Sequence, residues 1–187
     1  MNNAGYPLID LRFEAFWGAT QKNPPNFLFC FIDQMPEGMR KTLYFKDDDS
    51  RLSFLQGNYV TLTNMKDEDI DRIIKYRISP INVSVHTTNP ELRKQMLNNR
   101  FAGDIYERLI KLSKASISIN CQVVLCPGIN DGEELIKTVE DLYKLYPSIE
   151  NVAVVPVGIT KYREGLFNFK LFDKESASRE IENIKAL

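Results

Sequence analysis

The stretch Asn23-Pro-Pro-Asn-Phe-Leu-Phe-Cys-Phe-Ile-Asp-Gln-Met-Pro36 decides the fold of this chain. Its apolar part, residues 27–32, predicts a strand that runs into a polar turn. Strands of this kind open parallel α/β folds, and the loop after such a strand commonly carries the chemistry. The stretch contains one cysteine, Cys30, which is therefore the first candidate site residue.

The composition is that of an ordinary globular chain. Its 187 residues suffice for one well-buried domain, and its 24 basic and 25 acidic residues nearly cancel. We therefore expect no attraction to nucleic acid or to a membrane surface, and no apolar run has the length of a membrane-spanning helix. Three cysteines fit a reducing cytoplasm, where we expect the protein to reside, and a single histidine excludes a multi-histidine metal site.

Strand and helix signals alternate along the rest of the chain. Four more strands are predicted, at residues 59–62, 81–86, 117–126 and 152–157. Helical patterns are found at residues 66–77, 90–97, 103–114, 131–146 and 175–187. This alternation predicts an α/β fold with a parallel sheet of about five strands, right-handed crossovers and helices outside.

Three of the predicted strands have one apolar face and one polar face. Along residues 81–86, and again along residues 117–126, apolar and polar side chains alternate. Residues 59–63 place Thr61 and Thr63 on a common face. A parallel strand covered by helices on both sides is apolar on both faces, so this pattern favours a partial (β/α) barrel with a polar, ligand-holding interior.

The C-terminal ends of the strands define the candidate site, because barrels of this kind carry their chemistry there. The segments that should meet are residues 30–33, 63–64, 86–87, 126–131 and 156–160. His86 is the candidate catalytic residue, as a ligand or proton-transfer group. The alternative is a lone histidine hydrogen-bonded to the neighbouring strand.

Several motifs resemble one uncharacterised bacterial family. They are Cys30–Arg40, Leu43–Leu55, Gly57–Asn64, Val83–Arg93, Val124–Gly132 and Val154–Arg163, in consistent order within residues 26–170. The family consists of iron–sulfur oxidoreductases with a radical S-adenosylmethionine (SAM) core between a PDZ-like domain and a C-terminal domain of unknown function. The resemblance implies a poorly matched segment at residues 1–22, a radical SAM-like partial barrel at 23–163, and the start of a truncated C-terminal domain at 164–187.

The resemblance implies two cofactors, SAM and a four-iron, four-sulfur cluster, and a small-molecule substrate of unknown identity. In the family, a Cys-x-x-x-Cys-x-x-Cys motif holds the cluster, whose open iron binds SAM. Cys30 aligns with the third cysteine, whereas Asn23 and Phe27 occupy the first two positions. Since phenylalanine cannot ligate iron and asparagine is a poor substitute for a thiolate, we expect the chain to hold no cluster alone. Cys30 is then a surviving ligand position or, alternatively, a small buried apolar residue.

Strand ends and the family resemblance together give the candidate cofactor-binding residues. They are Thr61, Thr63, Asn64, Ser84, His86, Gln122, Pro127, Gly128, Asn130, Asp131 and Pro156. For residues 127–132 the second interpretation is turn chemistry, with Asn130 or Asp131 as a helix N-cap. Two functions are compatible with these features: a radical SAM oxidoreductase core with a degenerate cluster site, or a non-catalytic binding or scaffold module with the same partial barrel.

Overall fold

A computed structural model describes residues 28–44, 53–54 and 56–187 of the chain. The three strands found in this part are β1 (Ile81–Ser84), β2 (Ile119–Leu125) and β3 (Ile149–Pro156). Its α-helices are α3 (Asp67–Tyr76), α4 (Pro90–Met96), α5 (Ile105–Lys114), α6 (Glu133–Tyr143) and α7 (Lys174–Lys185). Short 3-10 helices are η1 (Ile32–Gln34), η2 (Lys41–Tyr44) and η3 (Ala102–Asp104).

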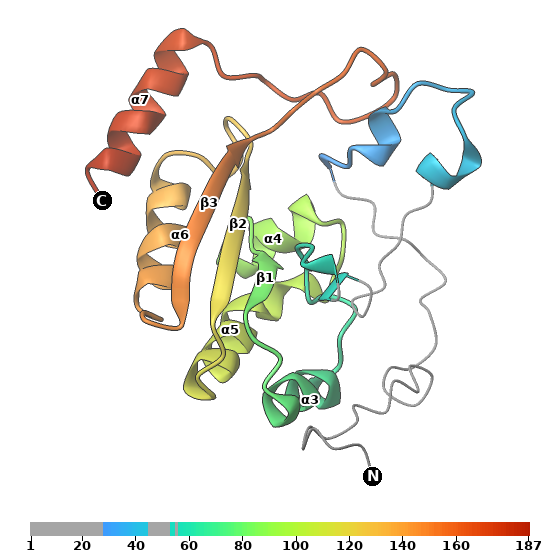
Figure 1. Cartoon of the computed structure of the whole chain (residues 1–187). Helices are drawn as coiled ribbons and strands as arrows, with labels where there is room; N and C mark the ends of the chain where they lie inside the picture. Colours follow the sequence, from blue (N-terminus) through green and yellow to red (C-terminus); the bar gives the residue numbers. More distant parts are fainter. Residues whose placement is uncertain (1–27, 45–52, 55) are drawn as a thin grey trace.

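The strands form one parallel sheet in the order β1-β2-β3. Helices α4 and α5 connect β1 to β2, and α6 connects β2 to β3, so each parallel pair is joined through helices (Figure 1). The predicted α/β class with a parallel sheet is confirmed by this arrangement. The predicted number of about five strands is not confirmed by the described residues.

Two of the predicted strands differ in the structure. Residues 28–32 form a turn that leads into η1, and Phe27 lies outside the described residues. The Gln34 side chain donates to the Cys30 carbonyl at 3.3 Å, a local bond that closes this turn. Residues 59–62 contribute only an isolated parallel bridge between Val60 and Val83. The extended segment ends there because Leu62 adopts a φ of 60°.

The apolar face of the sheet packs against helices. Along β2 every second residue is buried, as the alternation in the sequence predicts. Ile119 and Cys121 of β2 lie in one buried cluster with Ile73 of α3 and Leu109 of α5. Each such aliphatic side chain contributes about 1.5–3 kcal/mol when fully buried, so this face supplies much of the driving force for folding.

The opposite face of the sheet carries a row of asparagines. Asn82, Asn120 and Asn151 are partners in register on the three strands. Asn120 donates to Asn82 at 2.8 Å, and Asn151 donates to Asn120 at 2.5 Å. Asn82 in turn donates to the Gly57 carbonyl at 2.6 Å. This face is therefore polar and hydrogen-bonded, as the alternation along residues 81–86 and 117–126 predicts.

The end of the chain packs on the core through α7. The Glu180 carboxylate of α7 accepts a hydrogen bond at 3.0 Å from the Gly132 amide, which immediately precedes α6. The negative charge lies at the N-terminus of α6, where the helix dipole favours it. The predicted segment of residues 1–22 lies outside the described residues.

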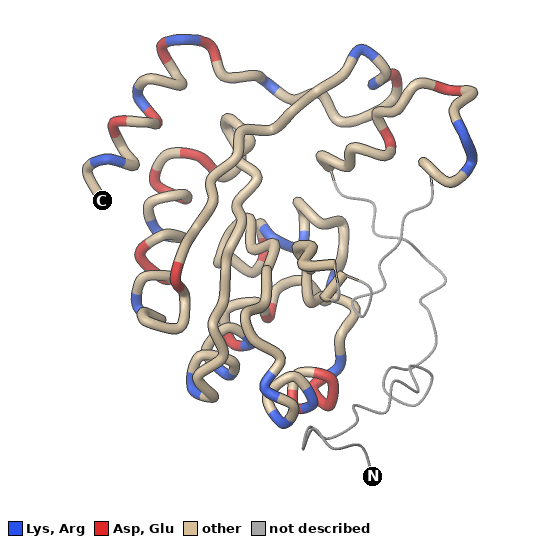
Figure 2. Tube along the Cα trace, in the orientation of Figure 1, with Lys and Arg blue, Asp and Glu red and all other residues tan. Residues whose placement is uncertain are grey.

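Charges of both signs are interleaved along the outer helices α3, α6 and α7 (Figure 2). Within the described part of the chain, no helix combines the length and the apolar character needed to cross a membrane.

Candidate functional site

The segments after the strands meet at one edge of the sheet. The ring of Phe29, in the turn that precedes η1, contacts the His86 ring edge-to-face at a centroid distance of 4.8 Å. Gln34 is fully buried, and its Oε1 accepts from the Thr160 amide at 3.1 Å. The Thr160 hydroxyl donates to the Gln34 carbonyl at 2.6 Å. These contacts join the segment around Cys30 to the end of β1 and to the loop after β3.

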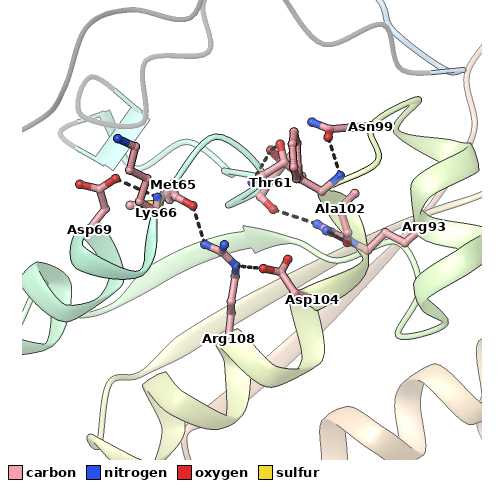
Figure 3. Close-up of polar contacts among 11 residues, drawn as sticks. Thr61, Met65, Lys66, Asp69, Arg93, Asn99, Ala102, Asp104 and Arg108 are labelled. Atoms are coloured by element: carbon pink, nitrogen blue, oxygen red, sulfur yellow. Dashed lines mark hydrogen bonds and ion pairs between the residues drawn. The ribbon is translucent and has the colours of Figure 1, made fainter.

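Arg93 of α4 binds this edge through hydrogen bonds to backbone carbonyls. Its guanidinium donates to the carbonyls of Val85 and Ser84 at 2.8 and 2.9 Å. It also donates to the carbonyls of Thr61 at 2.9 Å and Ala102 at 2.6 Å (Figure 3). Arg93 is almost fully buried, and burial lowers the pKa of its guanidinium to about 9, so it remains positively charged at neutral pH. One side chain thus ties together β1, the residue 61 segment and the loop before α5.

His86 is buried and neutral. Its Nδ1 accepts a hydrogen bond from the Val124 amide at 3.2 Å, so the ring proton lies on Nε2. Burial and, to a lesser degree, the Arg93 charge lower the pKa of His86 to about 3. The residue adopts a φ of 65°, which ends β1 two residues earlier than the sequence pattern predicts. This geometry matches the alternative in which the histidine bonds to its neighbouring strand.

The loop after β2 is held by side chains that bind backbone groups. Asn130 donates to the carbonyls of His86 and Val124 at 2.8 and 3.0 Å, and its Oδ1 accepts from the Cys126 amide at 2.7 Å. Asp131 accepts from the Gly128 amide at 2.8 Å, which closes the turn. The turn-chemistry interpretation is therefore correct, but the predicted N-cap is wrong.

The residue that caps α6 is Gly132, with a φ of 57°. The Oδ1 atoms of Asn130 and Asp131 instead accept bonds from the Cys126 and Gly128 amides within the turn.

Of the remaining candidate residues, four carry hydroxyl or amide groups at the edge of the sheet, and four lie in loops or at a strand end. Thr61 and Thr63 are buried and their hydroxyls share a hydrogen bond at 2.9 Å. Ser84 and Gln122 are partners in register on β1 and β2, one row above the asparagines. Pro127 and Asn64 are half-buried, whereas Gly128 and Pro156 are exposed in the loop and at the end of β3. The hydroxyl and amide groups of the first four residues are suitable donors and acceptors for a ribose or a purine ring.

The described cysteines do not fit a thiolate-held cluster. Cys121 and Cys126 are buried, and burial raises the pKa of each thiol to about 12. The Cys126 thiol lies 3.8 Å from the Val124 carbonyl as a hydrogen-bond donor. Cys30 is half-buried, and the positions Asn23 and Phe27 lie outside the described residues. Among the residues described, no three His, Cys, Asp or Glu side chains are grouped to hold a metal ion.

Sequence reasoning missed Arg93, Gln34 and Thr160 as organisers of this edge. Arg93 lies in a helix where an exposed cation is the usual expectation. The only sequence signal is its position on the same helix face as Met96 and Leu97, both of which are buried. Gln34 and Thr160 are 126 residues apart, so no local pattern connects them.

Comparison with known proteins gives one family and a small set of structural neighbours. Residues 9–152 match the family described as the radical SAM-like domain. No curated protein matches the chain.

The structure is similar to the crystal structure of Streptococcus suis SuiB, with a TM-score of 0.54 and 14% identity over 76% of this chain and 33% of SuiB. A crystal structure of SuiB bound to S-adenosylmethionine gives the same values. A radical SAM methyltransferase from Sphaerobacter thermophilus is less similar, with a TM-score of 0.43 and 20% identity over 63% of this chain and 35% of that one. The chain spans about a third of the length of these neighbours, and the similarity to SuiB supports the fold alone.

Proposed function

The chain belongs to the family of radical SAM-like domains, and on this basis we propose that it is the core of a radical SAM oxidoreductase with a degenerate cluster site. It binds an adenosyl ligand at the C-terminal edge of the sheet and performs no radical chemistry on its own. The narrower relationship, to bacterial iron–sulfur oxidoreductases with a PDZ-like domain, rests on the motifs at Cys30–Arg40 and Val83–Arg93.

The observation that carries this proposal is the disposition of the three cysteines. Such clusters are held by several thiolates, and the sequence has Asn23 and Phe27 where the motif has two of them. Neither remaining thiol compensates, because Cys121 and Cys126 are buried and have pKa values raised to about 12. A thiol in such surroundings loses its proton only at high pH, so it is a poor source of a metal-binding thiolate.

Adenosyl-ligand binding is supported by the donor set on the polar face. Ser84 and Gln122 lie side by side on neighbouring strands, and Thr61 is joined to the same edge through Arg93. The backbone at this edge is fixed by the bonds of Arg93 and Asn130, so the donors are held in place before a ligand arrives.

Anaerobic reconstitution with iron and sulfide tests the cluster part of the proposal. We expect the wild-type chain to remain colourless with no stoichiometric iron. The double variant Asn23→Cys with Phe27→Cys restores the three-cysteine motif, and we expect it to gain broad absorption at ~400 nm and about four irons per chain. A wild-type chain that takes up four irons would show that the site is not degenerate.

Isothermal titration with SAM and with its demethylated product, S-adenosylhomocysteine, tests the binding part. We expect both to bind the wild-type chain without iron, since the ribose and purine are common to both. Gln122→Leu removes one candidate donor and should weaken both ligands, whereas Asn151→Leu, in the row below, is the matched control. Absence of heat with either ligand would leave the chain as a scaffold module and refute binding.

A further inference from the structure

A cleft lies beside α4 and α5, near the edge of the sheet that Arg93 joins. It has a volume of about 770 Å³ and lies between the residue 63–66 segment, the first turns of α4 and the loop that leads into α5. This volume falls in the range of about 300–1,000 Å³ that is usual for small-ligand sites. Although Thr63 and Asn64 form its rim, the other lining residues are not among the candidates for the adenosyl site.

The walls of the cleft are fixed by two arginines. Arg108 donates to the Met65 carbonyl at 2.8 Å and to the Asp104 carboxylate at 2.6 Å (Figure 3). Arg93 holds the Ala102 carbonyl, next to Gly103 in the lining. The segment that ends in Met65 and the start of α5 are therefore held at a set separation, and the cleft is preformed.

The charge in the cleft is positive, in contrast to the chain as a whole. Its titratable lining side chains are Lys66, Lys94, Arg100, Arg108, Asp104 and Glu107. Four cations against these two carboxylates and Glu91, which pairs with Lys94 at 2.7 Å, leave a surplus of one positive charge, whereas the chain has a net charge of -1. Arg108 is neutralised by Asp104, but among the described residues neither Lys66 nor Arg100 has a carboxylate partner. A concave surface of one sign concentrates ligands of the opposite sign.

An aromatic ring is presented beside these cations. Phe101 is 59% exposed, which is unusual for a phenylalanine, and the Arg100 guanidinium lies 4.6 Å from its ring centroid. Gly103 allows the Lys94 stem to lie against the loop, because a Cβ at this position would come within 2.7 Å of Lys94 Cε. The cleft thus offers a flat apolar surface and two cations, Lys66 and Arg100, that have no carboxylate partner among the described residues.

We propose that this cleft binds a nucleoside phosphate, with the phosphates at Lys66 and Arg100 and the base against Phe101. A ring and a polyanion joined in one molecule match the two features of the cleft. SAM itself carries two positive groups and one carboxylate, so the surplus positive charge disfavours it here. The proposal therefore stands whether or not the adenosyl site on the sheet binds SAM.

Titration calorimetry with ADP, inorganic pyrophosphate and adenosine tests the assignment on the full chain. We expect ADP to bind more tightly than pyrophosphate, and adenosine to bind weakest, because only ADP uses both features. Raising the salt concentration should weaken ADP and pyrophosphate and leave adenosine nearly unchanged. Absence of saturable ADP binding up to about 1 mM, the level of a weak complex, would overturn the proposal.

Three exposed-residue variants locate the binding. We expect Arg100→Gln to weaken ADP about tenfold, which corresponds to one lost charge-assisted contact. Phe101→Leu should weaken ADP but leave pyrophosphate unchanged, and Lys185→Gln on α7 is the control lysine that should change neither. ADP affinity that is unaffected by Arg100→Gln, or competition between SAM and ADP for one site, would refute a separate nucleotide cleft.

Discussion

Acidification should destabilise this protein at a pH where most carboxylates are still ionised, because of His86. The histidine is buried, accepts a hydrogen bond from Val124 through Nδ1, and has a pKa lowered to about 3. In the unfolded chain its pKa returns to about 6.5. Below pH 6.5 the unfolded state therefore binds a proton that the folded state does not bind. The contribution of His86 to the free energy of unfolding is fully present above pH 6.5 and is lost as the pH falls toward 3.

The size of the effect follows from the two pKa values. Between pH 7 and pH 5 the unfolded state gains about 2 kcal/mol from protonation, while the folded state gains almost nothing. By pH 3, where the folded-state histidine is itself half protonated, the loss would reach about 4 kcal/mol, a large part of the stability of many domains. The range from pH 7 to pH 5 is the useful one, since carboxylates begin to titrate below it.

Urea unfolding at pH 7, 6 and 5 measures this loss, with His86→Asn as the matched variant. Asparagine retains an acceptor near the Nδ1 position and tolerates the φ of 65°, but it does not titrate. We expect its stability to be lower at pH 7, because the ring contact with Phe29 is lost, and flat between pH 7 and pH 5. Equal slopes for the two proteins would refute the reasoning. So would an NMR pKa near 6.5 for the imidazole, which is the only one in the chain.

Four further substitutions test the contacts that hold the fold. Arg93→Met leaves four backbone carbonyls without their donor, and we expect urea unfolding to show a loss of about 3–5 kcal/mol; a loss below 1 kcal/mol would contradict this role of Arg93. Cys30→Ser should change the free energy of unfolding by less than about 0.5 kcal/mol, because Cys30 is only half-buried. Cys126→Ser, at a buried position, should lower it by about 1–3 kcal/mol. Equal losses in the two variants would contradict this difference in burial. Glu180→Ala removes the acceptor of the Gly132 amide, so hydrogen exchange of α7 should accelerate relative to that of α5, and unchanged protection would refute this docking contact.

The fold class could be predicted from the sequence, because burial of one sheet face produces an alternation of apolar and polar residues along each strand. Residues 117–126 alternate in the sequence, and the burial pattern of β2 follows that alternation. The predicted ends of strands were less accurate, since they depend on single backbone angles. His86 and Leu62 both have positive φ, which terminates β1 and limits the residue 59–62 segment to a bridge. Neither is a glycine or asparagine, so nothing in the residue type announces the turn.

The sequence predicted that the segments after the strands meet, but it did not predict the bonds that their side chains make there. The ends of the predicted strands indicated His86 and Asn130. In the structure the Asn130 side chain donates a hydrogen bond to the His86 carbonyl at 2.8 Å. Their side chains bind backbone groups, a role that sequence cannot distinguish from ligand binding. Arg93 was missed because it acts over long range: its Nη atoms reach Thr61, 32 residues earlier in the chain.

The cluster position and the scaffold around it are physically separable in this protein. The bonds that assemble the edge of the sheet are made by the side chains of Arg93, Asn130 and Gln34, and the partner of each is a backbone group. Cys30 takes part through its backbone carbonyl, which accepts from Gln34 at 3.3 Å and would do so with any side chain at that position. A substitution at Cys30 would therefore remove its thiol without removing a contact, among the described residues, on which this edge depends. On the function proposed above, a radical SAM-like core without its redox centre would still retain this edge for a ligand.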